Sequence, residues 1–361
     1  MSKNQLIEFM EELDDSETTT ATTQPIGRTA KKRLSKKRET DAKLFIRAQQ
    51  VSRDFQFTYK AARFEEVWLL DSLVNLAEYQ WISDVLRKAK GGKEASVYLC
   101  RPGAAIPNAD FVAAKVYRPR MLRNLKNDQQ YRDGRVDLDN EGRQIVKDAD
   151  LHAMAKRTAY GESLRHQSWI SYEFTAMQTL FEAGADVPHP YSLTTNAILM
   201  DFIGDVLGSA PTLNEVALER DEVQPLFERT MRNVEILLTH GFVHGDLSAY
   251  NILYWEGNIT LIDFPQVVSP TGNRNAFAIF SRDVARLCEY FAKQGLDTDP
   301  RRLALDLWTR HGFKAREEVH APGCVRRKDH FGVRLGSERV PSCREFVSEL
   351  AEVVDLPVVH D

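Results

Sequence analysis

The chain has 361 residues, 43% of them hydrophobic, which is enough for a large core and for two lobes or domains. Its formal net charge of −4 is small for this length and does not indicate nucleic acid or a membrane surface as the main partner. The four cysteines lie far apart without a CxxC pair, the N-terminus does not read as a signal peptide, and no apolar run reaches the roughly 18 residues of a membrane span. We therefore expect a cytoplasmic protein with reduced thiols and no membrane association.

The N-terminal segment 1–62 divides by charge into an acidic start, a threonine-rich spacer and a basic run from Arg28 to Arg38. Such a segment buries too little apolar surface to fold alone, so we predict a largely disordered tail. The basic run is expected to be solvated, and the alternative is contact with RNA or an acidic partner. Residues 63–80 then carry apolar side chains at helical spacing, which predicts a helix packed on the main fold.

Residues 81–203 alternate short apolar runs with turns, which predicts strands at 81–87, 97–100, 111–117, 191–193 and 198–202. A helix is predicted at 169–181, and the charged segment 118–166 is expected to be a long mobile loop with at most short helical pieces. The turn from Lys90 to Ser96 reads Lys-Gly-Gly-Lys-Glu-Ala-Ser, and its backbone N–H groups can close over phosphates. By itself this turn fits a plain hairpin at least as well, and it lacks the GxxxxGK[ST] pattern of a Walker loop.

Two charged residues interrupt apolar patterns in this region. Lys115 lies in the middle of the apolar strand 111–117, where an ammonium group is costly unless a phosphate or a carboxylate pairs with it. Glu173 lies on the apolar stripe of the helix 169–181, where burial requires a cation; the alternative is a solvated place at the edge of the stripe. We therefore predict that Lys115 and Glu173 form an ion pair.

From Gly204 onward the pattern becomes helical. The strand 198–202 runs into Met200-Asp-Phe-Ile-Gly204, which is typical of a hinge between two lobes. Helices are expected at 213–217, 223–239, 277–291, 301–308 and 345–354. We assign 204–310 to a helical lobe and 311–361 to a C-terminal extension.

The segment His244-Gly-Asp-Leu-Ser-Ala-Tyr-Asn251 precedes a predicted β-hairpin formed by 252–255 and 259–262, and Asp263 follows the hairpin directly. The hairpin brings the carboxylates of Asp246 and Asp263 and the amide oxygen of Asn251 toward one spot. Oxygen ligands of this kind suit Mg²⁺ bound to the phosphates of a nucleotide. An aspartate followed five residues later by a metal-binding asparagine is also the spacing of the protein-kinase catalytic loop. These residues predict phosphoryl transfer from ATP.

Taken together, the motifs resemble those of the RIO family of atypical serine/threonine protein kinases. The resemblance covers about 80–295, and its matching strings are Gly92-Lys-Glu-Ala-Ser-Val-Tyr98, Ala114-Lys-Val-Tyr117, Met200-Asp-Phe-Ile-Gly204, His244-Gly-Asp-Leu-Ser-Ala-Tyr-Asn251 and Leu261-Ile-Asp-Phe-Pro-Gln266. It implies an α+β, two-lobed protein-kinase-like fold, with a small antiparallel β-sheet and one long helix in the N-lobe (81–203) and a mostly helical C-lobe (204–310).

The resemblance also implies a role for each site residue. The catalytic group consists of Asp246, which orients or deprotonates the acceptor hydroxyl, Lys115, which holds the α- and β-phosphates, and Glu173, which holds the lysine. The implied ligands of Mg²⁺, with Mn²⁺ as a substitute, are Asn251 and Asp263. The residues expected to contact ATP are Lys93, Ser96, Val97, Lys115, Met200, Asp201 and Ile203. Asp283 is expected to brace the catalytic loop; the alternative is an exposed helix carboxylate.

The sequence departs from ordinary kinases after Asp263. Pro265 stands where glycine is usual, and only residues 264–276 separate Asp263 from the next helix, too few for a conventional activation segment. A peptide-docking platform is therefore expected to be missing, and the protein substrate stays open. The resemblance implies autophosphorylation on serine, and Ser163 and Ser168 are candidates by location. ATPase activity is also compatible with it. It further implies a role in small-subunit ribosome maturation, in which the basic N-terminal run is a candidate contact for RNA or the ribosome.

Two other functions fit the same motifs. HGDxxxxN followed by IDF also occurs in small-molecule kinases similar to aminoglycoside and choline phosphotransferases, although the 92–98 string favours the RIO family. The third reading is a nucleotide-gated assembly factor that binds ATP and transfers little.

Overall fold

The computed structural model describes residues 55–314 except 93, 119–130, 132, 140 and 157. The predicted N-terminal tail up to residue 54, the basic run within it, Lys93 and the predicted helix 345–354 lie outside the described residues. In the part of the chain that is described, no helix is both long and apolar enough to cross a membrane.

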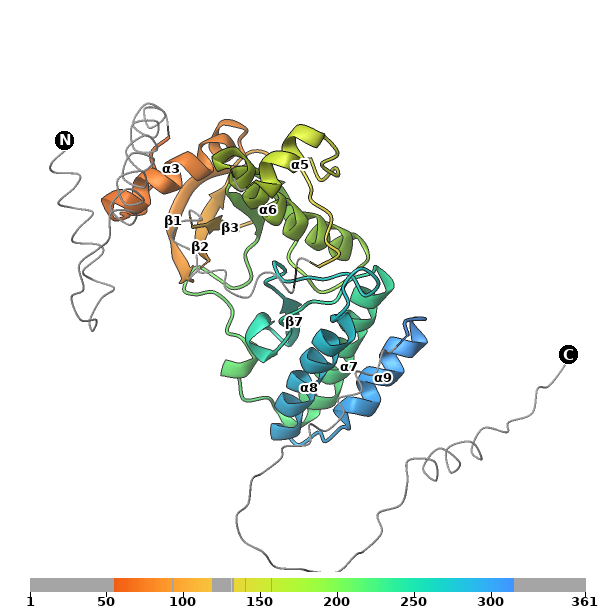
Figure 1. Cartoon of the computed structure of the whole chain (residues 1–361). Coiled ribbons are helices and arrows are strands. Elements are labelled where there is room, and N and C mark those ends of the chain that lie inside the picture. The colour runs from red at the N-terminus through yellow and green to blue at the C-terminus, as the bar shows by residue number, and fades with distance from the viewer. Residues whose placement is uncertain are drawn as a thin grey trace, which may run out of the picture. The chain divides into compact units, whose positions relative to one another are not determined.

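The N-lobe is built on a five-stranded antiparallel sheet in the order β1-β2-β3-β5-β4. Figure 1 labels β1, β2 and β3 of this sheet. The strands are β1 (Ile82–Gly91), β2 (Ala95–Pro102), β3 (Val112–Tyr117), β4 (Pro190–Leu193) and β5 (Ala197–Asp201). One face packs against helix α3 (Arg63–Glu78) through a core that includes Leu69, Leu73, Val85 and Tyr98. The opposite face, where Tyr117 and Ile198 lie, joins a second core with helix α6 (Ala159–Glu182) and the C-lobe.

The predicted loop at 118–166 is wrong in its C-terminal part. Helix α5 (Asp148–Ala155) is one of the short helical pieces that were expected there, but α6 begins at Ala159, well before the predicted start at 169. The side chain of Thr158 caps α6 by accepting the N–H of Gly161 at 3.0 Å. A Cβ at Gly161 would lie 2.0 Å from the Ala153 carbonyl oxygen, so glycine lets the two helices approach closely. Apolar periodicity reveals neither the cap nor this close packing, which accompany the earlier start of the helix.

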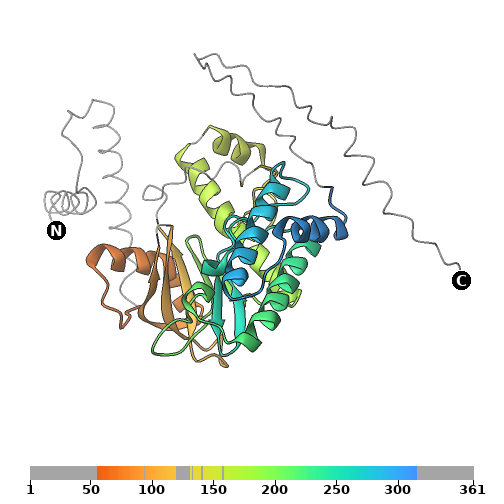
Figure 2. The same ribbon diagram turned by 90° about the horizontal axis from the view of Figure 1, so that it is seen from below.

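The C-lobe is mostly helical, with α7 (Arg220–Thr239), α8 (Ala276–Lys293) and α9 (Pro300–Arg310) (Figures 1 and 2). Its hairpin consists of β6 (Ile252–Trp255) and β7 (Asn258–Leu261), as predicted. The predicted helix 213–217 is a single 3₁₀ turn, η2 (Leu213–Glu215), and a second 3₁₀ turn, η3 (Ala249–Asn251), ends the catalytic loop. Edge-to-face packing of Phe227 on Phe291, with ring centroids 5.2 Å apart, joins α7 to α8. The predicted α+β, two-lobed kinase-like fold is confirmed.

The connection between the lobes is pinned at Asp201, the last residue of β5. Its carboxylate accepts hydrogen bonds from the Tyr191 hydroxyl at 2.5 Å and the His189 N–H at 3.0 Å, both from the neighbouring β4 region. Gly204 follows with φ 131°, a conformation that side chains rarely adopt. The Asp201 side chain thus fixes the hinge strand to the sheet, and the chain turns into the C-lobe immediately after it.

Candidate active site

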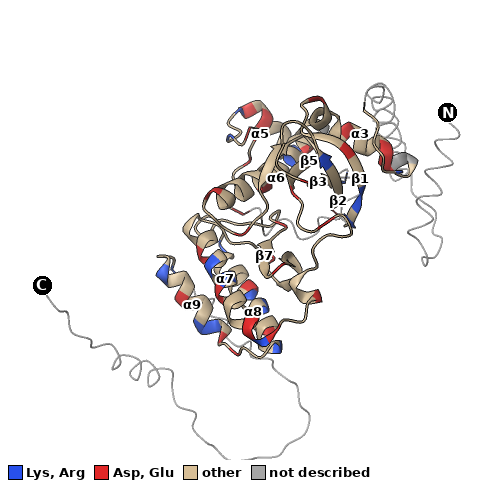
Figure 3. Ribbon diagram, turned by 180° about the vertical axis from the view of Figure 1, so that it is seen from behind, with Lys and Arg blue, Asp and Glu red and all other residues tan. Residues whose placement is uncertain are grey.

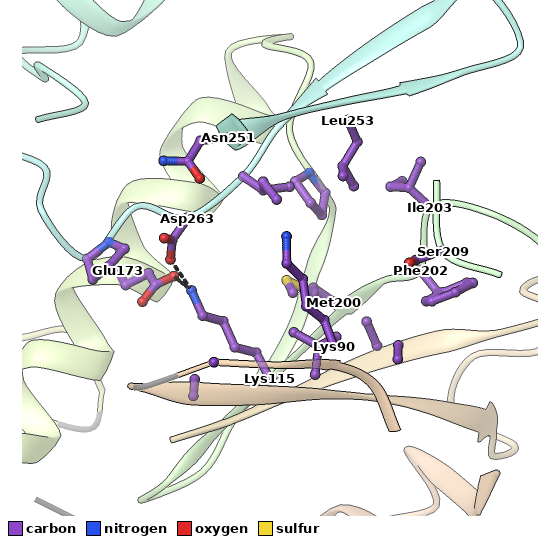
Figure 4. A pocket seen from close by; sticks show the side chains of 18 of the residues that line it. Lys90, Lys115, Glu173, Met200, Phe202, Ile203, Ser209, Asn251, Leu253 and Asp263 are labelled. Carbon is purple, nitrogen blue, oxygen red and sulfur yellow. Dashed lines mark hydrogen bonds and ion pairs between the residues drawn. The ribbon is translucent and has the colours of Figure 1, made fainter. Parts of the chain in front are cut away.

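A cavity of about 680 Å³ lies between the sheet of the N-lobe and the C-lobe, a volume typical of small-molecule sites (Figure 4). Its walls come from the β1–β2 turn, β3, α6, the hinge and the segment 251–266. These are the elements that the sequence motifs predicted for nucleotide binding, and the structure brings them together.

Lys115 projects from β3 into this cavity and bridges two carboxylates (Figure 4). Its Nζ donates to Glu173 Oε1 and to Asp263 Oδ1, both at 2.7 Å. Burial alone would lower the pKa of Lys115, but the negative charges of Asp263 and Glu173 outweigh it and raise that pKa above its ordinary value. Lys115 therefore keeps its positive charge at the end of the cavity.

Glu173 is 1% exposed, so the solvated alternative does not hold and the predicted ion pair with Lys115 is present. Its second oxygen, Oε2, accepts the hydroxyl of Tyr117 at 2.5 Å. The flanking apolar residues Ile170 and Met177 anchor this face of α6 in the core. The helix thus fixes the carboxylate, and the carboxylate fixes the lysine.

Asn251 and Asp263 lie on either side of the β6–β7 hairpin and meet because the hairpin returns the chain. The Ile262 N–H donates to the Asn251 carbonyl oxygen at 3.0 Å, next to Asp263. Asp263 has φ 73°, a left-handed conformation that aspartate tolerates better than most residues. Partial removal from water acts to raise the pKa of Asp263, but the charge of Lys115 outweighs it and holds that pKa below its usual value.

The donor set formed by these two residues fits Mg²⁺. The side-chain amide of Asn251 donates through Nδ2 to the Asp246 carbonyl oxygen at 2.8 Å, and its Oδ1 faces Asp263 (Figure 4). In nucleotide sites the protein usually supplies only one or two oxygen ligands to magnesium. Phosphate oxygens and water complete the coordination. Within the described ranges, no group of three or more His, Cys, Asp or Glu forms an all-protein metal cage.

The catalytic loop is braced from inside by α8. Gly245 has φ 85°, and a Cβ there would lie 2.2 Å from the Gln266 carbonyl oxygen, so only glycine fits. The Gly245 N–H donates to Asp283 Oδ2 at 2.9 Å, and Asp283 is buried, so the predicted brace is present. His244 is also buried, which lowers its pKa, and its Nε2 lies 3.1 Å from the Ile262 carbonyl oxygen.

Most of the residues predicted to contact ATP lie at the cavity. Val97, Met200, Asp201 and Ile203 line the cavity, with Ala113, Met177, Leu253 and Ile262 as further apolar lining. Lys93 lies outside the described residues.

Ser96 does not lie where it was predicted. Its side chain is 1% exposed and is absent from the cavity wall, whereas its neighbours Ala95 and Val97 are part of that wall. Side chains alternate along β2, so Ser96 shares its face with Tyr98, whose hydroxyl donates to Glu65 of α3 at 2.6 Å. The structure therefore does not place the Ser96 side chain on the cavity wall, and its predicted contact with phosphate is not supported by this placement.

Sequence reasoning also missed residues of the site. Lys90, the last lysine before the glycine turn, extends into the cavity (Figure 4). Arg286 of α8 forms an ion pair with Asp246, Nη1 to Oδ1, at 2.8 Å. The charged start of the Lys-Gly-Gly-Lys turn could have indicated Lys90, but no local signal distinguishes Arg286 from a solvated helix residue.

The segment after Asp263 returns directly to the catalytic loop. Val243 and Val268 exchange two backbone hydrogen bonds, both 2.9 Å long. Arg135, from the segment before α5, donates to the carbonyl oxygens of Pro265 and Val267 at 2.9 and 2.7 Å. Helix α8 then starts at Ala276, so residues 264–275 form a short, tied connection in place of a long activation segment.

The sequence of the chain is similar to one protein family and to named kinases within it. The RIO domain family matches residues 97–303, more than half of the chain. The RIO-type serine/threonine-protein kinase Rio1 of Haloferax volcanii is 30% identical over 208 residues, 58% of this chain and 63% of that protein. The serine/threonine-protein kinase RIO1 of Chaetomium thermophilum is 28% identical over 238 residues, 63% of this chain and 43% of that protein. The chain thus spans less than two thirds of the length of these two relatives.

Among solved structures, the chain is similar to the Rio2 kinase–ADP/Mg²⁺–phosphoaspartate complex from Chaetomium thermophilum, with a TM-score of 0.47 and 17% identity over 76% of this chain and 91% of that one. The resemblance read from the sequence motifs is confirmed by the family match, which covers the lysine, the glutamate, the catalytic loop and Asp263. The chain belongs to the RIO domain family.

Proposed function

We propose that the chain is an ATP- and Mg²⁺-dependent serine/threonine kinase of the RIO type, which transfers the γ-phosphoryl group of ATP to serine. The observation that carries this proposal is the meeting of Lys115, Glu173, Asp263 and Asn251 at one end of the cavity between the lobes. The curated relatives are named serine/threonine-protein kinases, which supports the same activity.

Lys115 is placed to hold the α- and β-phosphates. In the structure, Lys115 Nζ donates one hydrogen bond to the Asp263 carboxylate. When nucleotide binds, a phosphate oxygen replaces this carboxylate as the acceptor. Glu173 stays in place because it is buried and holds Tyr117 as well. Asp263 and Asn251 would hold Mg²⁺, which would supply positive charge to the phosphates during transfer.

The hinge is placed to hold the adenine ring. Met200 and Ile203 supply apolar surface, with Ala113 and Leu253 across the cavity. The Asp201 side chain is committed to Tyr191 and His189, so base recognition falls to the backbone of the hinge. Lys90 adds a cation on the cavity side of the glycine turn.

In this proposal Asp246 orients the acceptor hydroxyl and accepts its proton. It lies five residues before Asn251, whose amide bonds its carbonyl oxygen, so base and metal ligand are fixed together. Catalysis then rests on positioning the reacting groups and on neutralising charge on the phosphates.

The acceptor itself is expected to be a protein serine held without a peptide platform, because residues 264–275 are short and tied to the catalytic loop and to Arg135. Of the two serines proposed for autophosphorylation, Ser163 is exposed. Ser168 is buried, donates to Asp137 Oδ1 at 3.2 Å and accepts the Leu138 N–H at 3.0 Å. The structure favours Ser163.

The short connection also supports a second candidate function, a nucleotide-gated assembly factor in which ATP hydrolysis is the output. The two functions are separated by incubating the protein with γ-labelled ATP and Mg²⁺, alone and with a generic protein acceptor, and comparing it with D246A and D263A. Label on protein that both variants lose supports the kinase. Released phosphate without stable protein label supports the assembly factor, and failure to bind ATP refutes both.

A small-molecule kinase would instead transfer the phosphoryl group to an aminoglycoside or choline. The family match disfavours this alternative. Replacement of Mg²⁺ by Mn²⁺, a cytoplasmic location, and contact of the basic N-terminal run with RNA or the ribosome stay predictions.

A further inference from the structure

Helix α8 presents three charged side chains to the catalytic loop, one turn apart at most: Arg282, Asp283 and Arg286. Figure 3 shows that α8 carries both signs of charge. Arg282 donates to the Gly245 carbonyl oxygen and to Asp283 Oδ1, and Asp283 accepts the Gly245 N–H. These two residues fix the backbone just before the catalytic aspartate.

Arg286 acts on the side chain of that aspartate. Its Nη1 donates to Asp246 Oδ1 at 2.8 Å, a charge-assisted hydrogen bond of normal length. The other carboxylate oxygen, Oδ2, has only a long contact, 3.4 Å, with Asn251 Nδ2. One oxygen of the carboxylate is therefore committed to Arg286, and the other is left for a further partner.

We propose that Arg286 is a positioning residue that orients the Asp246 carboxylate for the acceptor hydroxyl, an inference that rests on the kinase function proposed above. A lone aspartate side chain can rotate about two bonds, and the planar guanidinium selects the rotamer in which Oδ2 is free. Arg286 lies on α8, whose apolar face is buried with Leu287 and Phe291, so its backbone is fixed relative to the loop.

The ion pair between Arg286 and Asp246 contributes little to the stability of the fold. The side chains of Arg286 and Asp246 are 40% and 36% exposed, and ion pairs at that exposure contribute little to folding. Asp283, by contrast, is nearly fully buried and carries the structural brace. Removal of Arg286 is therefore expected to change the reaction more than the fold.

The step that depends on this geometry is the transfer itself. The acceptor O–H gives its proton to Asp246 Oδ2 while its oxygen forms a bond to the γ-phosphorus. The bond from the γ-phosphorus to the β,γ-bridging oxygen breaks, and ADP leaves with that electron pair. With the carboxylate turned away, the hydroxyl loses its acceptor, although ATP is bound as before.

The test compares wild type with R286A, R286K and the control R310A. Arg310 is matched because it lies on another C-lobe helix, is 56% exposed and also pairs with carboxylates, Glu235 at 2.7 Å and Asp306. For each protein, the measurements are the thermal midpoint, the affinity for ATP, and kcat and KM for label transfer from γ-labelled ATP. R286A is also assayed with guanidinium chloride added at low, non-denaturing concentration.

We expect R286A to lower kcat on the order of 10- to 100-fold, with ATP affinity and thermal midpoint close to wild type. R286K is expected to recover part of the rate, and free guanidinium part of the rate of R286A, whereas R310A behaves as wild type. An unchanged kcat in R286A refutes the inference. So does a lower kcat that guanidinium does not restore and that is accompanied by losses of ATP affinity and thermal stability. Absence of transfer by the wild-type protein refutes the proposed function instead.

Discussion

Replacing Lys115 with methionine tests the central ion network, because it keeps most of the side-chain length and removes the charge that Glu173 and Asp263 share. Loss of the Lys115 charge affects the two carboxylates differently, because water can reach only one of them. The Asp263 side chain is 43% exposed and can be hydrated, whereas the Glu173 side chain is 2% exposed and keeps only the Tyr117 hydroxyl. Leaving one buried charge without its partner costs about 3–5 kcal/mol, so we expect K115M to lose about 3 kcal/mol of unfolding free energy at pH 7.

The unfolding free energy is also expected to depend on pH, and the direction follows from the pKa shifts of Asp263 and Lys115. In the wild type the pKa of Asp263 is lowered, so its contribution is present above the ordinary aspartate pKa of about 4 and is lost as the pH falls below it. The pKa of Lys115 is raised, so its contribution is present below the ordinary lysine pKa of about 10.4 and is lost only at higher pH. These two groups therefore give the wild type no slope between pH 5 and 7.

In K115M the contribution of Asp263 is absent at every pH. The cost of the substitution is therefore expected to be the same at pH 5 and pH 7, and to become smaller as the pH falls below the ordinary aspartate pKa of about 4.

The assay is urea unfolding followed by tryptophan fluorescence at pH 5 and pH 7, with the double variant K115M/E173Q as control. The double variant removes both buried charges, so we expect it to regain most of the loss and to show no slope over this range. The reasoning is refuted if K115M loses less than about 1 kcal/mol at pH 7, or if the double variant is as unstable as K115M.

Three further substitutions test other features of the site. G245A forces a Cβ to within 2.2 Å of the Gln266 carbonyl oxygen at φ 85°, so we expect a loss of about 1–3 kcal/mol in thermal or urea unfolding, and reduced transfer. S96A should leave the KM for ATP unchanged, since Ser96 faces α3, and a large increase would contradict that placement. K90A should raise the KM for ATP about tenfold while kcat changes little, because a cation near the phosphates is removed; an unchanged KM would show that Lys90 does not reach the nucleotide.

Much of the site follows from local sequence. The hairpin is specified by two apolar runs around a short turn, so the closeness of Asn251 and Asp263 is a consequence of chain geometry over a dozen residues. The Lys115–Glu173 pair follows from a different argument, that a charge in an apolar pattern needs an opposite charge. Both inferences succeed because each depends on a strong and local constraint.

The errors have a common cause. The start of α6 at Ala159 has a side-chain cap from Thr158 and a close approach to α5 at Gly161, and neither feature gives a periodic apolar signal. The face of β2 on which Ser96 lies depends on the register of β2 against β3, where Val97 stands opposite Lys115. A shift of one residue would reverse every side chain, and the turn sequence alone does not fix it.

By itself the sequence determined the kinase-like lobes, the catalytic loop, the lysine with its glutamate and the closeness of Asn251 to Asp263, because periodicity, turn chemistry and the cost of burying charge act within single elements. Only the tertiary structure decided which side of the cavity each residue faces, and that Arg286, 40 residues after Asp246, holds its carboxylate. A charged side chain on a helix surface looks the same in sequence whether water or a catalytic aspartate is its neighbour, since that choice is made by how α8 packs beneath the loop.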